Sequence, residues 1–182
     1  MDMWSKTWYC LIMNEFFNYT PPSFDVTCMK QVYLAAERSK DPRTKIGAVL
    51  VKDRNIIGTG YNGFARKVLD LPDRYNDREL KYKFVVHAEA NSVLTCARLG
   101  TKTMDSVLYT NGIPCDSCMK SIIQGGIKEI IIHKQWPEMT HSNWIESTRI
   151  SKIMMIEANI KLRWLDMVLG INGYLDGKII SV

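Results

Sequence analysis

Two short stretches of the chain each begin a predicted helix, and together they offer three soft metal ligands. His87 stands at the start of one helix, and the Pro-Cys-Asp-Ser-Cys segment of residues 114–118 opens the other. Cys115 and Cys118 are three positions apart, so both sulfurs share one face of a first helical turn. A fold that uses all three side chains on one metal must bring two helix N-termini to the same point.

Two cysteines and one histidine are a ligand set for zinc that leaves the fourth position open. The chain has five cysteines, an odd number, and no recognisable secretion signal, which argues against a disulfide framework. The first turn of a helix also favours thiolates, because its free N–H groups and dipole lower a cysteine pKa. We therefore predict one Zn²⁺ per chain, bound by His87, Cys115 and Cys118.

Glu89 is the candidate catalytic residue beside this metal. Two positions along a helix rotate by about 200°, so His87 and Glu89 converge only if His87 precedes the regular helix. Zinc with two thiolates and a neutral imidazole carries no net charge and acidifies a bound water less than a three-histidine site does. A base is then needed, and Glu89 would carry a proton to a ring nitrogen of the substrate and later to a departing amine.

A purely structural zinc clasp is the alternative, and it requires a fourth protein ligand. The candidates for that ligand are Cys10, Cys28, Cys96, His133 and His141. A glutamate two residues after the histidine and a proline before the first cysteine are unnecessary for a clasp. The combination of His-x-Glu and Pro-Cys-x-x-Cys resembles the signature of zinc-dependent nucleobase deaminases.

The order of elements predicts an α/β fold. Apolar residues at three- and four-residue spacings predict a helix over 25–39, and two β-branched runs around a polar turn predict an antiparallel hairpin. Further strands are expected over 106–110, 129–133 and 161–165, and further helices over 87–99, 114–124 and 143–158. This alternation predicts a three-layer α-β-α domain with one mixed five-stranded sheet. The charged stretch 65–83 is expected to be an irregular loop.

The domain plan has three parts. Residues 1–23 form an N-terminal extension whose aromatic side chains should pack on the core or on another subunit. Residues 24–165 form the catalytic domain, and residues 166–182 form a small hairpin or a loose tail. Apolar runs are far shorter than the ~20 residues that cross a bilayer, so we expect a cytoplasmic protein and no membrane partner.

A wider set of motifs resembles the deoxycytidylate (dCMP) deaminases over about residues 24–165. These motifs are Ser-Lys-Asp-Pro at 39–42, Ile-Gly-Ala-Val at 46–49, Gly-Thr-Gly-Tyr-Asn-Gly at 58–63, His-Ala-Glu-Ala-Asn at 87–91, the cysteine segment at 114–118 and Gly-Ile-Lys-Glu at 126–129. The resemblance implies a cytidine-deaminase-like fold. It also implies zinc-dependent hydrolysis of dCMP to dUMP and ammonia, which supplies dUMP for dTMP synthesis.

The resemblance also implies roles for residues outside the metal site. Asn62 would bind the sugar 3′-hydroxyl, although Tyr-Asn-Gly also suits an ordinary turn. The backbone at Ala88 and Glu89 would meet the pyrimidine edge. Trp136 stands where the family has a tyrosine near the nucleotide, and a core or surface tryptophan is the alternative reading. The candidates for the substrate phosphate are Lys40, Arg43, Lys45 and Arg66.

Members of this family are often homohexamers that dCTP activates and dTTP inhibits. By resemblance, the effector site would use Ser39, Lys40, Asp41, Gly60 and Gly63, with Mg²⁺ accompanying a triphosphate. Such an effector would bias the loop that carries Asn62. An ordinary solvated helix end at Lys40 and Asp41 is the alternative.

Two other classes of function stay open at this point. The first is a deaminase of tRNA or single-stranded nucleic acid, against which the scattered basic residues and net charge of only +5 argue. The second is a non-catalytic zinc module that binds a partner, against which Glu89 argues.

Overall fold

The computed structural model describes residues 20–137 and 142–182. At its centre is a five-stranded sheet in the order β2-β1-β5-β6-β7. The bounds of these strands are Asn55–Tyr61 for β2, Gly47–Lys52 for β1, Val107–Thr110 for β5, Glu129–His133 for β6 and Lys161–Leu165 for β7. Strand β1 is antiparallel to both of its neighbours, whereas β5, β6 and β7 run parallel. The prediction of one mixed five-stranded sheet is confirmed.

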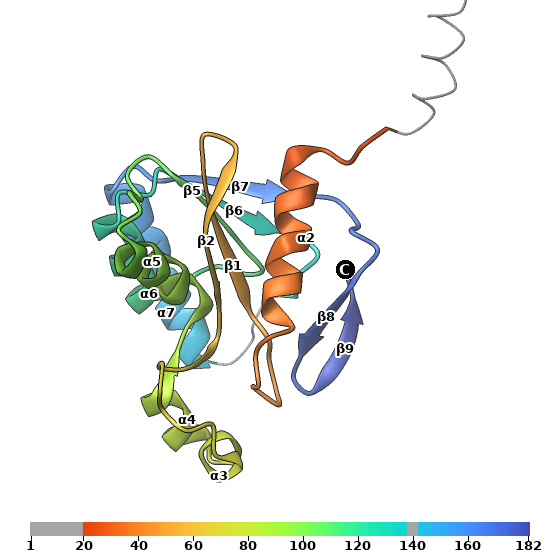
Figure 1. Ribbon diagram of the computed structural model, residues 1–182, viewed down its shortest axis with the longest axis vertical. Coiled ribbons are helices and arrows are strands. Elements are labelled where there is room, and N and C mark those ends of the chain that lie inside the picture. Colours follow the sequence, from red (N-terminus) through yellow and green to blue (C-terminus); the bar gives the residue numbers. More distant parts are fainter. Residues whose placement is uncertain (1–19, 138–141) are drawn as a thin grey trace, which may run out of the picture.

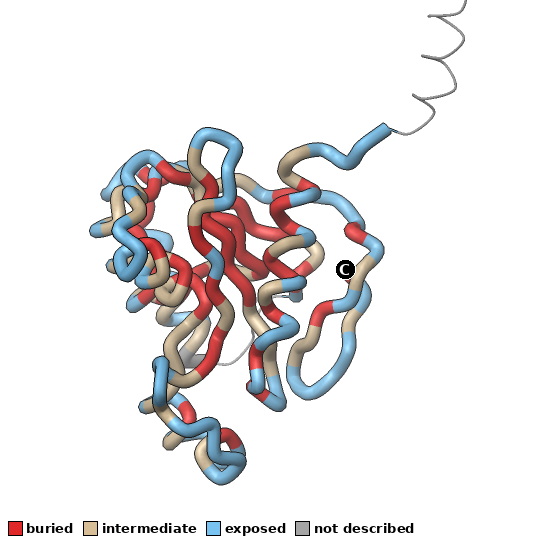
Figure 2. The backbone as a smooth tube through the Cα atoms, viewed as in Figure 1, coloured by how far each residue is buried: buried red, intermediate tan, exposed pale blue. Residues whose placement is uncertain are grey.

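Helices cover both faces of the sheet (Figure 1). Helix α2 (Phe24–Ala36) lies on one face, and α5 (Ala88–Leu99), α6 (Asp116–Gln124) and α7 (Ser142–Glu157) lie on the other. Figure 2 shows that the buried backbone concentrates in the strands between these layers. The three-layer α-β-α architecture is therefore confirmed.

Strand β1 contributes side chains to two hydrophobic cores, one on each face of the sheet. Successive side chains of a strand point to opposite faces. Ala48 and Leu50 accordingly join the core under α5, α6 and α7, while Val49 and Val51 join the core under α2. All four are buried, which explains why this strand reads as a continuous apolar run.

The charged stretch 65–83 is not an irregular loop as we expected. It contains two short helices, α3 (Pro72–Asn76) and α4 (Arg78–Phe84), next to a small ladder of β3 (Gly63–Phe64) and β4 (Val85–Val86). The Asp77 side chain caps α4 by accepting from the Leu80 amide at 2.9 Å. The prediction was wrong because the high charge density does not prevent helix formation here: a cap residue and the proline at the start of α3 favour the two short helices.

The C-terminal residues form a hairpin of β8 (Asn172–Leu175) and β9 (Lys178–Ser181), one of the two forms expected for this segment. Its turn has Asp176 at φ 50° and Gly177 at φ 77°, the backbone of a type I′ turn. The expected packing of the N-terminal extension falls on residues 1–19, which lie outside the described residues. Among the described helices, none combines the length and apolar content that a bilayer crossing requires.

Candidate active site

The three predicted metal ligands meet at the N-termini of α5 and α6. His87 caps α5 with an extended backbone, φ −70° and ψ 157°, and Cys115 caps α6, with Cys118 in the first turn. One ligand atom from each of His87, Cys115 and Cys118 lies within 4.8 Å of the other two. Such convergence of one imidazole and two thiols fits a tetrahedral zinc ion with one open position.

The surroundings of the Cys115 sulfur favour its thiolate form. It lies 3.3 Å from Nδ1 of His87 and accepts a hydrogen bond from the Cys118 amide at 3.4 Å. Hydrogen bonding from the Cys118 thiol, and then from His87, lowers the pKa of the Cys115 thiol to about 4. A thiolate at a helix N-terminus is the form that binds zinc.

Glu89 lies beside the ligands in the first turn of α5. Glu89 is only 6% exposed, and its Oε2 is 3.6 Å from Sγ of Cys118. Burial raises the pKa of the Glu89 carboxyl above its usual value. Because His87 adopts an extended backbone before the helix begins, both side chains reach the same point, as the spacing argument required.

The alternative of a four-ligand clasp finds no fourth ligand among the described residues. Cys28 is buried in the core under α2, and Sγ of Cys96 contacts the carbonyl of Ile57 at 3.4 Å. His133 is held between the Tyr33 hydroxyl and the Met167 carbonyl. The remaining candidates, Cys10 and His141, lie outside the described residues.

A cavity of about 340 Å³ opens next to Glu89. Its volume falls in the range typical of small-molecule sites. The described residues that line it are Asp41, Arg43, Thr44, Ile46, Asn62, Arg78, Lys81, Tyr82, Val85, His87, Ala88, Glu89, Gly112, Ile113, Trp144, Leu175 and Asp176. Sequence reasoning singled out only part of this wall.

The predicted substrate residues Asn62 and Ala88 both line the cavity. Asn62 is buried, and its side chain also holds the preceding loop: Oδ1 accepts from the Ile46 amide and Nδ2 donates to the Thr44 carbonyl, both at 2.8 Å. Each of these atoms keeps further hydrogen-bonding capacity for a ligand. Asn62 therefore stabilises the loop before β1 and also lines the cavity.

Trp136 does not join the cavity. It is 5% exposed and packs in the core under α2, where its ring centroid lies 6.0 Å from that of Tyr33. Another tryptophan, Trp144 at the start of α7, lines the cavity and stacks on His87 with a centroid distance of 5.8 Å and an interplanar angle of 26°. Nothing in the periodicity of the predicted helix distinguished Trp144 from a packing residue.

Of the four phosphate candidates, only Arg43 lines the cavity. Lys40 instead pairs with Asp70, and Nζ of Lys45 lies 5.5 Å from the Tyr174 ring centroid. Sequence reasoning missed Arg78, which lines the cavity from α4. Within the described part of the chain neither Arg43 nor Arg78 forms an ion pair, so both guanidinium groups are available to an anion.

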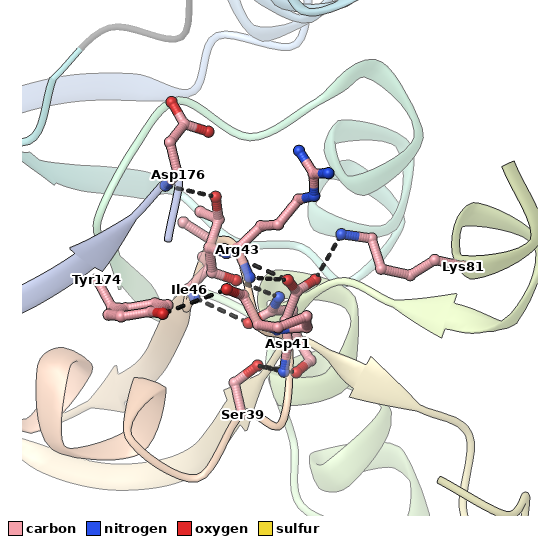
Figure 3. Close-up of polar contacts among 10 residues, drawn as sticks. Ser39, Asp41, Arg43, Ile46, Lys81, Tyr174 and Asp176 are labelled. Atoms are coloured by element: carbon pink, nitrogen blue, oxygen red, sulfur yellow. Dashed lines mark hydrogen bonds and ion pairs between the residues drawn. The ribbon is translucent and has the colours of Figure 1, made fainter. Parts of the chain in front are cut away.

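Helix α4 offers one face to the cavity. Arg78, Lys81 and Tyr82 line it, at the i, i+3 and i+4 positions that share a helix face. Lys81 is paired with Asp41, as Figure 3 shows, and the distance from Nζ to Oδ2 is 2.9 Å. The i, i+3, i+4 spacing was the available signal, but it is visible only once the stretch is recognised as helical.

Three of the residues proposed for an effector, Ser39, Lys40 and Asp41, lie in the loop that precedes β1. Ser39 Oγ donates to the Asn62 carbonyl at 2.7 Å, and Asp41 Oδ1 accepts from the amides of Arg43 and Thr44 (Figure 3). The buried Ser39 and Asp41 thus give this loop its shape, unlike the exposed Lys40.

The two glycines of the proposed effector set sit at the other end of this region. A Cβ on Gly60 would lie 2.1 Å from the carbonyl oxygen of Ala88, so strand β2 and helix α5 meet there without room for a side chain. At Gly63 a Cβ would meet only the Tyr61 ring, at 3.6 Å. The close packing against α5 thus explains why residue 60 is a glycine, whether or not an effector binds there.

Fold and site together have the features of the zinc-binding deaminase class: a three-layer sheet domain in which two helix N-termini present His87, Cys115 and Cys118 beside Glu89. Residues 22–134 match the family described as the cytidine and deoxycytidylate deaminase zinc-binding region. The chain belongs to this family.

Individual relatives agree with this assignment. A protein of Aliivibrio fischeri described as an uncharacterized deaminase is 34% identical over 134 residues, which cover 74% of this chain and 88% of that protein. Human deoxycytidylate deaminase is 40% identical over 109 residues, covering 57% of this chain and 60% of the human one. The chain thus spans less than two thirds of the human relative.

A solved structure supports the fold. The crystal structure of dCMP deaminase from the cyanophage S-TIM5 in complex with dCMP and dUMP matches with a TM-score of 0.60 at 24% identity. The match covers 81% of this chain and 100% of that one. The cytidine-deaminase-like fold expected from the sequence is therefore confirmed.

Proposed function

We propose that this protein is a zinc-dependent deaminase that hydrolyses dCMP to dUMP and ammonia. The observation that carries the proposal is the buried carboxylate of Glu89, with Oε2 3.6 Å from the sulfur of Cys118, at the edge of a nucleotide-sized cavity. Human deoxycytidylate deaminase, 40% identical over the shared region, bears the corresponding name. A clasp that only holds the fold does not need this carboxylate.

The residues of the site have separate tasks. His87, Cys115 and Cys118 would hold the zinc, which when bound supplies a Lewis acid that activates a water for attack on the amidine carbon of the base. Glu89 would take a proton from the attacking water and donate it to the ring nitrogen; it would then take the second proton, from the hydroxyl newly bonded to the carbon, and deliver it to the amine, which leaves as ammonia while the carbonyl forms. Burial raises the pKa of the Glu89 carboxyl, which favours a group that both accepts and returns a proton.

The residues that line the cavity suit a nucleoside monophosphate. Glu89 and His87 lie in the wall that would receive the base, with Trp144 offering an aromatic face. Asn62 and the backbone at Ala88 would bind the sugar and the pyrimidine edge. Arg43 and Arg78 provide cationic groups for the 5′-phosphate.

Further features of the family form part of this proposal. They are supply of dUMP for dTMP synthesis, activation by dCTP, inhibition by dTTP, Mg²⁺ with the effector, a homohexameric assembly and a cytoplasmic location. The effector would act through the loop of Ser39 and Asp41, with Lys40, Gly60 and Gly63, because Ser39 contacts the backbone of Asn62. A change in that loop would alter the substrate site.

A direct assay tests the proposal. Purified zinc-loaded protein is incubated with dCMP while the loss of cytosine absorbance is followed, with and without dCTP. We expect turnover in the wild type and a loss of at least about 100-fold in kcat for Glu89→Gln, with zinc content unchanged. Deamination of an RNA oligonucleotide without any action on dCMP under all effector conditions would overturn the substrate assignment in favour of a nucleic acid.

A further inference from the structure

The C-terminal hairpin lies outside residues 22–134, the part of the chain that matches the family. Its turn nevertheless reaches the cavity, because Leu175 and Asp176 line the wall together with Glu89 and Asn62. Nothing in the metal site requires these residues. Their position raises the question of what the hairpin does for a bound nucleotide.

The hairpin is joined to the loop before β1 mainly through the backbone. The Lys45 amide donates to the Tyr174 carbonyl at 3.0 Å, and the Gly177 amide donates to the Arg43 carbonyl at 2.7 Å. Lys45 and Tyr174 form an antiparallel bridge, so the loop adds to the hairpin like a short extra strand. Weaker contacts run from the Tyr174 hydroxyl to Pro42 and from the Asp176 amide to Thr44, as Figure 3 shows.

The loop that the hairpin holds carries one proposed substrate contact and fixes the side chain of another. The side chain of Arg43 lines the cavity, and the carbonyl of Thr44 and the amide of Ile46 fix the side chain of Asn62. A shift of the loop would therefore displace a guanidinium group and an amide together. Both groups are proposed to contact the sugar or the phosphate and not the reacting atoms, so their displacement should weaken substrate binding.

The hairpin is itself anchored in the core. Val182 is buried, and its amide and carbonyl bond to Ile171 and Leu169. Gly173 lies against Trp136 and Tyr33, where a Cβ would come within 3.0 Å and 3.2 Å of the two rings. The hairpin thus packs against the buried Trp136. This contact with the core fixes the position of the hairpin residues that line the cavity.

We propose that the C-terminal hairpin is a substrate-positioning element: Leu175 forms a wall of the nucleotide cavity, and the backbone of residues 174–177 clamps the loop of Arg43. This inference rests on the proposed function for the identity of the nucleotide. The clamp itself can be measured without any turnover.

Steady-state kinetics with dCMP test the wall. We expect Leu175→Ala to raise KM by at least about 5-fold with kcat changed less than about 2-fold, because it removes an apolar wall and no reacting group. Leu175→Met, which restores the volume, should return KM to near the wild-type value. The matched control is Lys178→Ala, an exposed position that pairs with Leu175 across the hairpin and does not line the cavity.

Hydrogen–deuterium exchange tests the clamp in the 182-residue chain. Gly177→Val strains the turn because φ is 77°, while the added Cβ would meet nothing nearer than 3.9 Å. We expect faster exchange in the peptide covering residues 43–46, no change in the peptides of α6, and wild-type exchange in Lys178→Ala.

The results separate the two proposals. Absence of dCMP turnover in the wild type would count against the proposed function, while the exchange experiment would still decide the clamp. Wild-type turnover with an unchanged KM in Leu175→Ala, or unchanged exchange of residues 43–46 in Gly177→Val, would overturn the positioning role. Equal losses in Leu175→Ala and Leu175→Met would overturn it as well, since they would indicate general loss of structure.

Discussion

Asp41 and Lys81 form an ion pair of 2.9 Å in which the side chains are only 5% and 7% exposed. The pair joins the loop before β1 to helix α4, two segments that both line the cavity. The second carboxylate oxygen of Asp41 is also satisfied, because it accepts from the amides of Arg43 and Thr44. Removal of one partner would leave a buried charge without compensation.

Disruption of this pair should therefore depend on whether one or both charges are removed. We expect Asp41→Asn to lower the free energy of unfolding by about 3–5 kcal/mol. The double variant Asp41→Asn/Lys81→Met should be less destabilised than the sum of the single variants, measured by urea denaturation. Additive losses would show that the two charges do not compensate each other.

The metal should stabilise the fold as well as serve the reaction. Because zinc binds the folded site, we expect chelation to lower the melting temperature of the purified protein. Cys118→Ser should lower both the zinc content and the melting temperature, measured by elemental analysis and calorimetry. Cys96→Ser is the control, since this buried thiol contacts the Ile57 carbonyl and lies outside the ligand group. Full zinc content in Cys118→Ser would contradict the assigned ligand set.

The two tryptophans should respond differently to truncation. Trp144→Ala removes the ring against His87 and should raise KM for dCMP, with a smaller effect on the free energy of unfolding. Trp136→Ala opens a hole in the core under α2 and should cost about 3–5 kcal/mol of stability. Kinetics and urea denaturation of both variants check this. A larger KM effect from Trp136→Ala at equal folded fraction would restore it as a substrate residue.

Arg78 should distinguish a nucleotide from a nucleoside. A charge-assisted hydrogen bond to phosphate contributes enough that Arg78→Ala should raise KM for dCMP roughly 10- to 100-fold. Turnover of deoxycytidine, which lacks the phosphate, should not change. Lys83→Ala removes a positive charge from the exposed side of the same helix and serves as the control. An equal effect on both substrates would rule out a phosphate contact.

His133 should make stability depend on pH. Its Nε2 donates to the Met167 carbonyl at 2.8 Å, so in the neutral ring Nδ1 accepts from the Tyr33 hydroxyl at 2.7 Å. Burial lowers the pKa of His133 below its ordinary 6.5. Below pH 6.5 the unfolded chain binds a proton that the folded chain does not, so stability falls as the pH drops.

The measurement is urea denaturation between pH 5 and 8. The slope that His133 contributes below pH 6.5 is at most about 1.4 kcal/mol per pH unit, and it should vanish above that pH. His133→Gln should reduce the slope. Identical slopes in the wild type and the variant would exclude this group as the source.

The metal site and the sheet were predictable because their signals are local. Strands such as Glu129–His133 have an uninterrupted apolar centre, here Ile130 to Ile132, and each helix that carries a ligand starts with its own cap residue. The requirement that His87 and Glu89 converge also follows from helical geometry alone. These parts of the fold need no information from distant segments.

The rest of the cavity depends on packing between distant segments. Arg78 and Lys81 reach it because the charged stretch forms α4, and Leu175 reaches it because the hairpin pairs with the loop at Lys45. Trp136 lies away from the cavity because its ring packs in the core under α2. Neither spacing nor composition contains this information.

The close approach at Gly60 has a consequence for the chemistry. With a Cβ only 2.1 Å from the Ala88 oxygen, even an alanine would push α5 away from the sheet. That displacement would also move His87 and Glu89, which flank Ala88 in the chain. The absence of a side chain at Gly60 would thus keep the proposed proton carrier aligned with the proposed metal ligands, although Gly60 is not itself one of these residues.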